Sequence, residues 1–303
     1  MAHLSREERD RGVVACSAGN HAQGVALSAR KLGCQATIVM PLATPAIKVN
    51  AVRTHGGPTV DVRLFGNNYD EAATEAKRLE EVEGMAMIHP FDDPYVIAGQ
   101  GTIGMEVLKE CVSGPLDAIF VCCGGGGMLA GIAAYVKRVR PNVKVIGVEA
   151  ADAAGMTSSL EEGRVVTLPT VGLFADGAAV KTIGSETFRI CNKLVDEMVT
   201  VSTDQICDAI KLSYNDARVV LEPAGALGVA GMKKYVEENV LLSWWHVVST
   251  VIILASLLAL ACIGQSLPLR IIASILAGFV TTRLFVLYHD FQHHSILNGS
   301  KAA

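Results

Sequence analysis

Charged side chains are scarce in this chain of 303 residues. Asp, Glu, Lys and Arg make up 18% of the sequence, against about 25% in an average soluble protein, whereas half of the residues are hydrophobic. The formal net charge is -4, and Lys and Arg are not concentrated in any stretch. A nucleic-acid-binding surface needs such a basic patch to neutralise phosphates. The composition therefore predicts that nucleic acid is not a partner.

Regular cysteine spacings are also missing, although the chain has eight cysteines. No pair is spaced as CxxC, and the adjacent Cys122 and Cys123 lie in an apolar run, where a thiol acts as a small hydrophobic group. These patterns do not fit a disulfide framework or a structural zinc site. The opening residues, MAHLSREERDRG, lack the apolar core of a signal peptide. We expect a reducing compartment.

Short apolar runs alternate with helical patterns over residues 1–239. We expect strands in GVVACS, QATIVMP, PTVDVRLF, MAMIHP, DAIFVCC, VKVIGVEA and EMVTVS, with helices such as NYDEAATEAKRLEEVEG and GMLAGIAAYVKRVRP between them. Strands that alternate with helices form parallel sheets in α/β proteins. Binding sites in such folds lie where the carboxyl ends of strands lead into helices. The turns at these points are the first places to search for a site.

The composition changes abruptly at Val240. From there to Gly264 the chain has about 25 residues without Asp, Glu, Lys or Arg, more than the roughly 20 that cross a bilayer. After a short break, residues 271–288 form a second apolar segment, with Arg283 close enough to its end to extend outward. This pattern predicts a two-helix transmembrane hairpin in residues 240–303. A buried helical hairpin of a soluble core is the alternative.

The hairpin would place both of its ends on one side of the membrane. Lys233 and Lys234 favour the cytoplasm for that side, although Glu237 and Glu238 weaken the bias. We therefore expect a membrane-associated protein whose residues 1–239 lie in the cytoplasm.

Four consecutive glycines, Gly124–Gly127, stand between an expected strand and an expected helix. Without side chains, their backbone N–H groups can approach an anion closely, and a helix N-terminus adds partial positive charge. The sequence GK[ST] of a P-loop does not follow, and the spacing GxGxxG of a dinucleotide site fits poorly. The pattern predicts a backbone cradle for phosphate, with a tight turn as the alternative.

The stretch SAGNHAQG, residues 17–24, has the same arrangement of strand, polar turn and helix. Ser17 is placed to cap the helix, and the amide of Asn20 can both donate and accept hydrogen bonds. We expect an anion or substrate loop here. A helix cap beside a packed histidine is the alternative.

These two turns, together with HPFDD, IAGQGTIGMEV, VIGVEA, FADGAAV and LEPAGALGVAGMKKY, resemble fold-type II pyridoxal-phosphate enzymes, especially threonine dehydratase and serine racemase. The resemblance covers about residues 5–239. It implies the α/β domains of the tryptophan synthase β type, with a small-domain portion over roughly residues 15–100 and a large domain over the remainder of 1–239. It implies a lyase of amino-acid metabolism, isoleucine biosynthesis included.

The resemblance also assigns roles to residues. Gly124, Gly125, Gly126, Gly127 and Met128 would bind the phosphate of pyridoxal 5'-phosphate. The loop for the substrate carboxylate would consist of Ser17, Gly19, Asn20 and His21, and Asn20 would also bond the ring hydroxyl. Glu149, Asp176 and Glu222 lie in motifs near the mouth of the site, where surface or capping roles stay open.

The activity implied is deamination of L-threonine or L-serine to a 2-oxo acid and ammonia, with serine racemase-like activity as the alternative. A homo-oligomer stays open. In the resembled family, a lysine in a segment similar to SFKxRGA precedes the SAGNH turn and forms the Schiff base with the cofactor. None of residues 1–16 is lysine, and a serine turn similar to SGAN is not found after GMKKY. We therefore expect impaired activity and, at best, non-covalent cofactor binding.

The last 60 residues resemble the N-terminal part of a membrane fatty-acid desaturase, through SWWHVVSTVIILASLLALACIG and RLFVLYHDFQHHSIL. In that family, a box such as HDFQHH supplies iron ligands, which here would be His289, His293 and His294. A polar helix end at the membrane surface is the alternative. Two segments that resemble unrelated families, each incomplete, meet near residues 238–241, and this junction predicts a chimeric gene or gene model. A third hypothesis for the function is non-catalytic binding of pyridoxal phosphate or another anion by a membrane-tethered protein.

Overall fold

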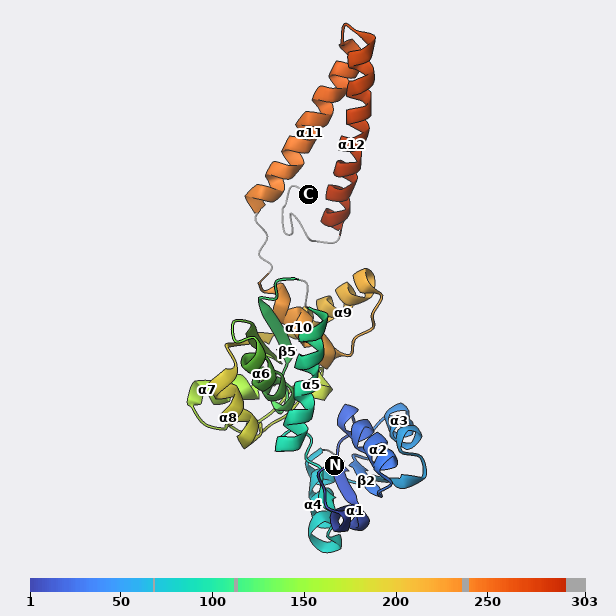
Figure 1. Cartoon of the computed structure of the whole chain (residues 1–303), viewed down its shortest axis with the longest axis vertical. Helices are drawn as coiled ribbons and strands as arrows, with labels where there is room; N and C mark the ends of the chain where they lie inside the picture. The colour runs from blue at the N-terminus through green and yellow to red at the C-terminus, as the bar shows by residue number, and fades with distance from the viewer. Residues whose placement is uncertain (68, 112–113, 236–239, 293–303) are drawn as a thin grey trace. The chain divides into compact units, whose positions relative to one another are not determined.

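The computed structural model describes residues 1–67, 69–111, 114–235 and 240–292, and the chain forms two compact units, Met1–Met232 and Lys233–Ala303 (Figure 1). The elements of the first unit are α1 (Arg6–Arg11), β1 (Val13–Cys16), α2 (Asn20–Leu32), β2 (Ala36–Met40), α3 (Ala46–Gly56), η1 (Gly57–Thr59), β3 (Val60–Leu64), α4 (Tyr69–Glu83), β4 (Ala86–Met87), α5 (Pro94–Glu110), β5 (Ala118–Cys122), α6 (Gly127–Val139), β6 (Lys144–Ala150), α7 (Gly155–Glu162), η2 (Asp176–Ala178), α8 (Ser185–Leu194), β7 (Glu197–Val201), α9 (Thr203–Ala217) and α10 (Pro223–Lys233).

The seven expected strands are confirmed, and they form two parallel sheets. The first sheet has the order β3-β2-β1-β4, with Val13 opposite both Ala36 and Ala86. The second has the order β5-β6-β7, with Ala118 opposite Lys144. The predicted α/β architecture with parallel strands is therefore confirmed. All carboxyl ends of one parallel sheet meet at one edge, which places the turns after β1 and β5 at such edges.

Apolar side chains occupy both faces of the first sheet, because helices cover each face. Successive residues of a strand point to opposite sides. Val13 and Ala15 accordingly join a core cluster with α2 and α3, whereas Val14 and Cys16 pack against Ala72, Ala76 and Leu79 of α4. This two-sided burial accounts for the unbroken apolar runs of β1 and β2.

The second unit contains α11 (Val240–Ile263) and α12 (Leu267–Gln292), which pack against each other. Both helices are long and apolar enough to cross a membrane, with mean hydropathy values of 2.4 and 1.9 in their most apolar windows. Most of their large apolar side chains are exposed. Arg283 of α12 donates a hydrogen bond to Nδ1 of His246 in α11 at 3.1 Å. The expected pair of helices is thus present.

Candidate phosphate and carboxylate loops

The four-glycine loop leads from β5 into α6, as the sequence predicts. Across the described part of the chain, the backbone N–H groups of Gly125, Gly126, Gly127 and Met128 have no acceptor. Unpaired N–H groups at the start of a helix form a binding site for an anion. The loop therefore fits a phosphate group.

Each of these glycines is also required by close packing. Gly126 has a φ of +92°, and a Cβ there would lie 2.6 Å from Cε of Met156 and 2.9 Å from Cβ of Thr187. A Cβ on Gly125 would overlap the ring of Phe91. The left-handed φ is one that only glycine adopts without strain. The tight turn and the anion cradle are thus the same structure, and the two interpretations of the sequence do not compete.

The loop of residues 17–21 follows β1. The prediction that Ser17 caps α2 is wrong: its Oγ accepts the Gly19 N–H at 3.2 Å, and the cap position belongs to Gly19, which has no side chain. The side chain of Asn20 is exposed at the start of α2. His21 donates from Nε2 to the carbonyl oxygen of Ile88 at 2.9 Å. The ring of His21 is thus packed against Ile88, and Ser17, Gly19, Asn20 and His21 remain the predicted carboxylate loop.

Residues 88–93 form a segment organised around His89. Nδ1 of His89 accepts the N–H groups of Asp92 at 2.8 Å and Phe91 at 3.3 Å. Burial lowers the pKa of His89, against the opposing influence of Asp92 and Asp93. The motif HPFDD carried part of the family resemblance, but no pattern in the sequence indicated which residues it contacts.

Replacing His89 by Asn is expected to reduce the dependence of stability on pH. Because its pKa is below the ordinary value of 6.5, the unfolded chain binds more protons than the folded chain below pH 6.5, and stability falls as the pH drops through the folded pKa. The oxygen of Asn accepts the same N–H groups without titrating. Urea unfolding of the two proteins at about pH 7.5 and about pH 5.5 measures the difference.

The expected result is that wild type loses more of its free energy of unfolding over this interval than His89→Asn. His21 is present in both proteins, and its pKa is lowered by burial first and also by the charge of His89, so the variant loses the titration of His89 together with its effect on His21. An equal loss in both would show that His89 does not titrate in this range.

Glu149 caps a helix. Its carboxylate, which is fully buried, accepts the N–H groups of Met156 at 2.8 Å and Thr157 at 2.9 Å and the hydroxyl of Thr157 at 2.7 Å. Burial raises the pKa of Glu149, and these hydrogen bonds oppose the rise. Of the two roles left open for Glu149, the structure shows capping of α7.

The buried cysteines beside Glu149 are held as thiols. Burial raises the pKa of Cys123 well above its ordinary value, with Glu149 adding to the rise. Burial and then Glu149 raise the pKa of Cys191 to about 12. Because the thiolate is the nucleophile, neither cysteine is suited to covalent catalysis.

Asp176 and Glu222 are exposed and lie near each other around Gly177. Asp176 forms an ion pair with Lys48 at 2.7 Å, and this pair joins α3 to the segment at η2. A surface role is what the structure shows for both carboxylates, and Lys48 is the partner of one of them.

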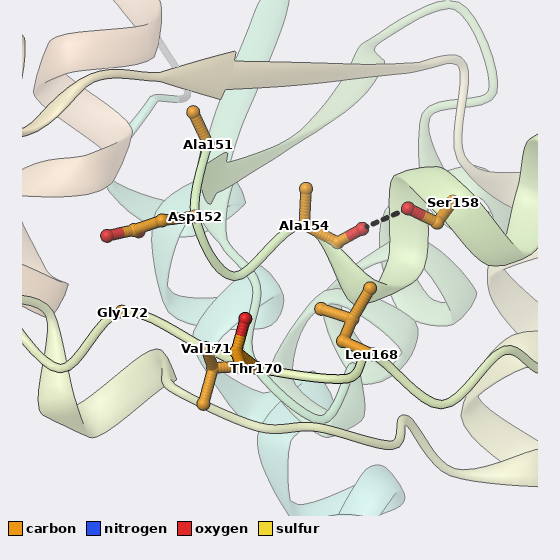
Figure 2. Close-up of a pocket in the computed structure, with 8 residues that line it drawn as sticks. All are labelled: Ala151, Asp152, Ala154, Ser158, Leu168, Thr170, Val171 and Gly172. Carbon is orange, nitrogen blue, oxygen red and sulfur yellow. Dashed lines mark hydrogen bonds between the residues drawn. The ribbon is translucent and has the colours of Figure 1, made fainter.

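A cavity of about 510 Å³ lies elsewhere, beyond the carboxyl end of β6. Figure 2 shows it between the turn that carries Ala151, Asp152 and Ala154 and the segment from Leu168 to Gly172. The labelled side chains include one carboxylate, that of Asp152. None of the predicted site residues lines this cavity, and no motif in the sequence indicated it.

The predicted histidine box falls mostly outside the described residues. His289 is exposed near the end of α12, whereas His293 and His294 lie beyond residue 292. Within the described ranges, no group of three or more His, Cys, Asp or Glu side chains is placed to hold a metal. Iron ligation stays a prediction.

A sequence model of one enzyme family, described as pyridoxal-phosphate dependent enzyme, matches residues 1–251. That range includes both loops and both sheets. The chain belongs to the pyridoxal-phosphate-dependent enzyme family. The unpaired N–H groups of the four-glycine loop agree with this membership, because they suit the phosphate of that cofactor.

Relatives within this family are close. The chain is 56% identical over 239 residues to the biosynthetic L-threonine dehydratase of Burkholderia multivorans, covering 79% of this chain and 47% of that protein. It is 56% identical over 235 residues to the chloroplastic biosynthetic threonine dehydratase of Arabidopsis thaliana, covering 78% and 39%. The chain thus spans less than half the length of these relatives.

Solved structures show the same fold. Processed threonine deaminase isoform 2 of Solanum lycopersicum matches with a TM-score of 0.72 and 51% identity, over 76% of this chain and 66% of that one. Maize serine racemase matches with a TM-score of 0.70 and 35% identity, over 75% and 68%. The fold-type II assignment made from the motifs is therefore confirmed.

Proposed function

We propose that residues 1–239 form the cofactor- and substrate-binding part of an L-threonine dehydratase, which converts L-threonine to 2-oxobutanoate and ammonia. The observation that carries the proposal is the row of unpaired N–H groups from Gly125 to Met128 at the start of α6, in a chain 56% identical to such dehydratases. Serine racemase-like activity is the second candidate, supported by the 35% identity to the maize enzyme.

In this proposal, the residues of the chain bind and orient the cofactor and the substrate. Gly124–Gly127 and Met128 would hold the cofactor phosphate, and Ser17, Gly19, Asn20 and His21 would hold the substrate carboxylate at the start of α2. When bound, pyridoxal phosphate supplies an electron sink for the charge left at the substrate α-carbon. Moving the α-proton requires a base such as the family lysine, and none of residues 1–16 is lysine. We propose that the two loops bind these ligands through hydrogen bonds.

Binding of a stable probe tests this proposal without requiring turnover. Phosphopyridoxyl-L-threonine, a reduced conjugate of cofactor and substrate, presents both a phosphate and a carboxylate. We expect the full chain to bind it at least about tenfold more tightly than phosphopyridoxyl-1-amino-2-propanol, which lacks the carboxylate, since a charge-assisted hydrogen bond contributes about 1.5–3 kcal/mol. Titration calorimetry of the detergent-solubilised chain measures both affinities.

Asn20→Ala is expected to remove most of that preference. Because Asn20 is also the expected partner of the ring hydroxyl, the affinity for both probes should fall, and it should fall further for the probe with a carboxylate. Asn142→Ala, at an exposed asparagine in the turn between α6 and β6, is the matched control, because this turn precedes β6 and lies at the opposite edge of the sheet from the four-glycine loop. Equal affinities of wild type for the two probes would refute the carboxylate loop.

We further propose that α11 and α12 tether the protein to a membrane, which their length and exposed apolar side chains support. A non-catalytic, membrane-tethered protein that binds pyridoxal phosphate would show the same binding without turnover. A desaturase-like role for residues 240–303, with iron at the histidine box, rests on the sequence of HDFQHH alone.

A further inference from the structure

The first turn of α8 is capped by a residue from a distant part of the chain. Asp92 accepts the N–H groups of Ser185 at 3.0 Å, Glu186 at 2.9 Å and Thr187 at 3.1 Å. The preceding residue, Gly184, makes room for it, since a Cβ there would overlap the carboxylate of Asp92. An anionic group suits the N-terminus of a helix. Asp92 thereby fixes where α8 begins.

Thr187 connects this helix to the four-glycine loop. Its side chain is fully buried, and its hydroxyl donates to the carbonyl oxygen of Gly125 at 2.8 Å and lies 3.0 Å from that of Gly184. The Gly184 N–H also donates to the Gly125 oxygen, at 3.3 Å. The carbonyl of Gly125 is thus bonded to the start of α8 by two donors.

This bond determines the direction of a neighbouring N–H group. In a planar trans peptide, the C=O of Gly125 and the N–H of Gly126 point in opposite directions. Holding the Gly125 oxygen on Thr187 therefore turns the Gly126 N–H away from α8, and that N–H has no acceptor among the described residues. Without the Thr187 hydroxyl, only the longer bond from the Gly184 N–H would hold the carbonyl, and the peptide would be less firmly oriented toward the anion.

We propose that Thr187 and Asp92 are positioning residues for the cofactor phosphate: Asp92 places the start of α8, and Thr187 orients the peptide between Gly125 and Gly126. Neither residue touches the phosphate. This inference rests on the proposed function, because it takes the four-glycine loop as the phosphate site. Under this inference, phosphate affinity depends on two side chains that lie outside the four-glycine loop, those of Thr187 and Asp92.

The same segment reaches the carboxylate loop. Nδ1 of His89 holds the N–H of Asp92, and the carbonyl of Ile88 accepts from His21 in the first turn of α2. Residues 88–92 therefore form a hydrogen-bonded connection from α2 to α8. Asp92 is the residue at which this connection meets the phosphate side.

The test compares two probes in the full chain, phosphopyridoxyl-L-threonine and its dephosphorylated form, pyridoxyl-L-threonine. For Thr187→Val, which keeps the shape but lacks the hydroxyl, we expect at least a tenfold loss of affinity for the phosphorylated probe and less than a twofold change for the other. Thr187→Ser restores the hydroxyl and is expected to recover the affinity. Thr167→Val, at an exposed threonine that pairs with Thr182, is the control.

Asp92→Asn is the second variant, used in the same way if Thr187→Val does not fold; its expected loss is also confined to the phosphorylated probe. The inference is overturned if wild type prefers the phosphorylated probe and folded Thr187→Val or Asp92→Asn keeps that preference, or if both probes lose affinity equally. If wild type binds both probes with equal affinity, the proposed function fails. That outcome is distinguishable from failure of the inference, in which wild type prefers the phosphorylated probe and a folded variant keeps that preference.

Discussion

Gly126→Ala is expected to lower the affinity of the chain for phosphopyridoxyl-L-threonine by about a hundredfold. The φ of +92° at this position disfavours alanine by about 1–2 kcal/mol. The new methyl group would also lie 2.9 Å from Cβ of the buried Thr187, so the loop has to move. Displacing one N–H donor from an anion costs about 1.5–3 kcal/mol, and the upper end of that range corresponds to the hundredfold loss.

Gly99→Ala is the matched control for this substitution. Gly99 lies within α5 and is exposed, and a Cβ there would meet no atom within 4 Å. Alanine favours a helix over glycine by about 1 kcal/mol, so stability should rise slightly and probe affinity should not change. Full affinity in Gly126→Ala would show that the four-glycine loop does not hold the phosphate.

Local patterns were sufficient to predict the strands. Each of the seven strands is an apolar run between turn residues, and their parallel direction follows from the alternation with helices. The order β3-β2-β1-β4 and the division into two sheets were not predicted. The four-glycine loop was predictable for the same reason, because strand, glycines and helix are contiguous in the sequence. No distant residue was needed to place Gly124–Gly127 at the start of α6.

Contacts between distant residues were not predictable. Asp92 and Ser185 are 93 positions apart, and no spacing rule connects an aspartate after HPF to the start of a helix that far along the chain. Ser17 was assigned as a cap from its residue type alone, but the chain continues to Gly19 before α2 begins. Glu149 is distinguished only by its burial, which the sequence around VIGVEA does not reveal.

For the C-terminal segment as well, the sequence predicted the helices but not the contacts between them. The lengths of α11 and α12 follow from their apolar composition, and both helices are present. The bond between His246 and Arg283 was not foreseen, because each had been considered only within its own segment. It joins polar residues of the two helices at a place where the hydropathy pattern alone provides no register.

The central claim is that residues 1–239 contain a threonine dehydratase site that needs a lysine not found among residues 1–16. The most direct measurement is 2-oxobutanoate release from L-threonine by two purified proteins. One is the 303-residue chain, and the other is the same chain with an SFKxRGA-type segment fused before Met1. A fused segment in which alanine replaces the lysine is the control.

The account predicts no release above background from the 303-residue chain or from the alanine control, and equal amounts of 2-oxobutanoate and ammonia from the lysine fusion. The lysine moves the proton at the substrate α-carbon, a step that the residues of the two loops do not provide. A lysine fusion that binds phosphopyridoxyl-L-threonine as tightly as the 303-residue chain, yet releases no 2-oxobutanoate from L-threonine, would contradict the account.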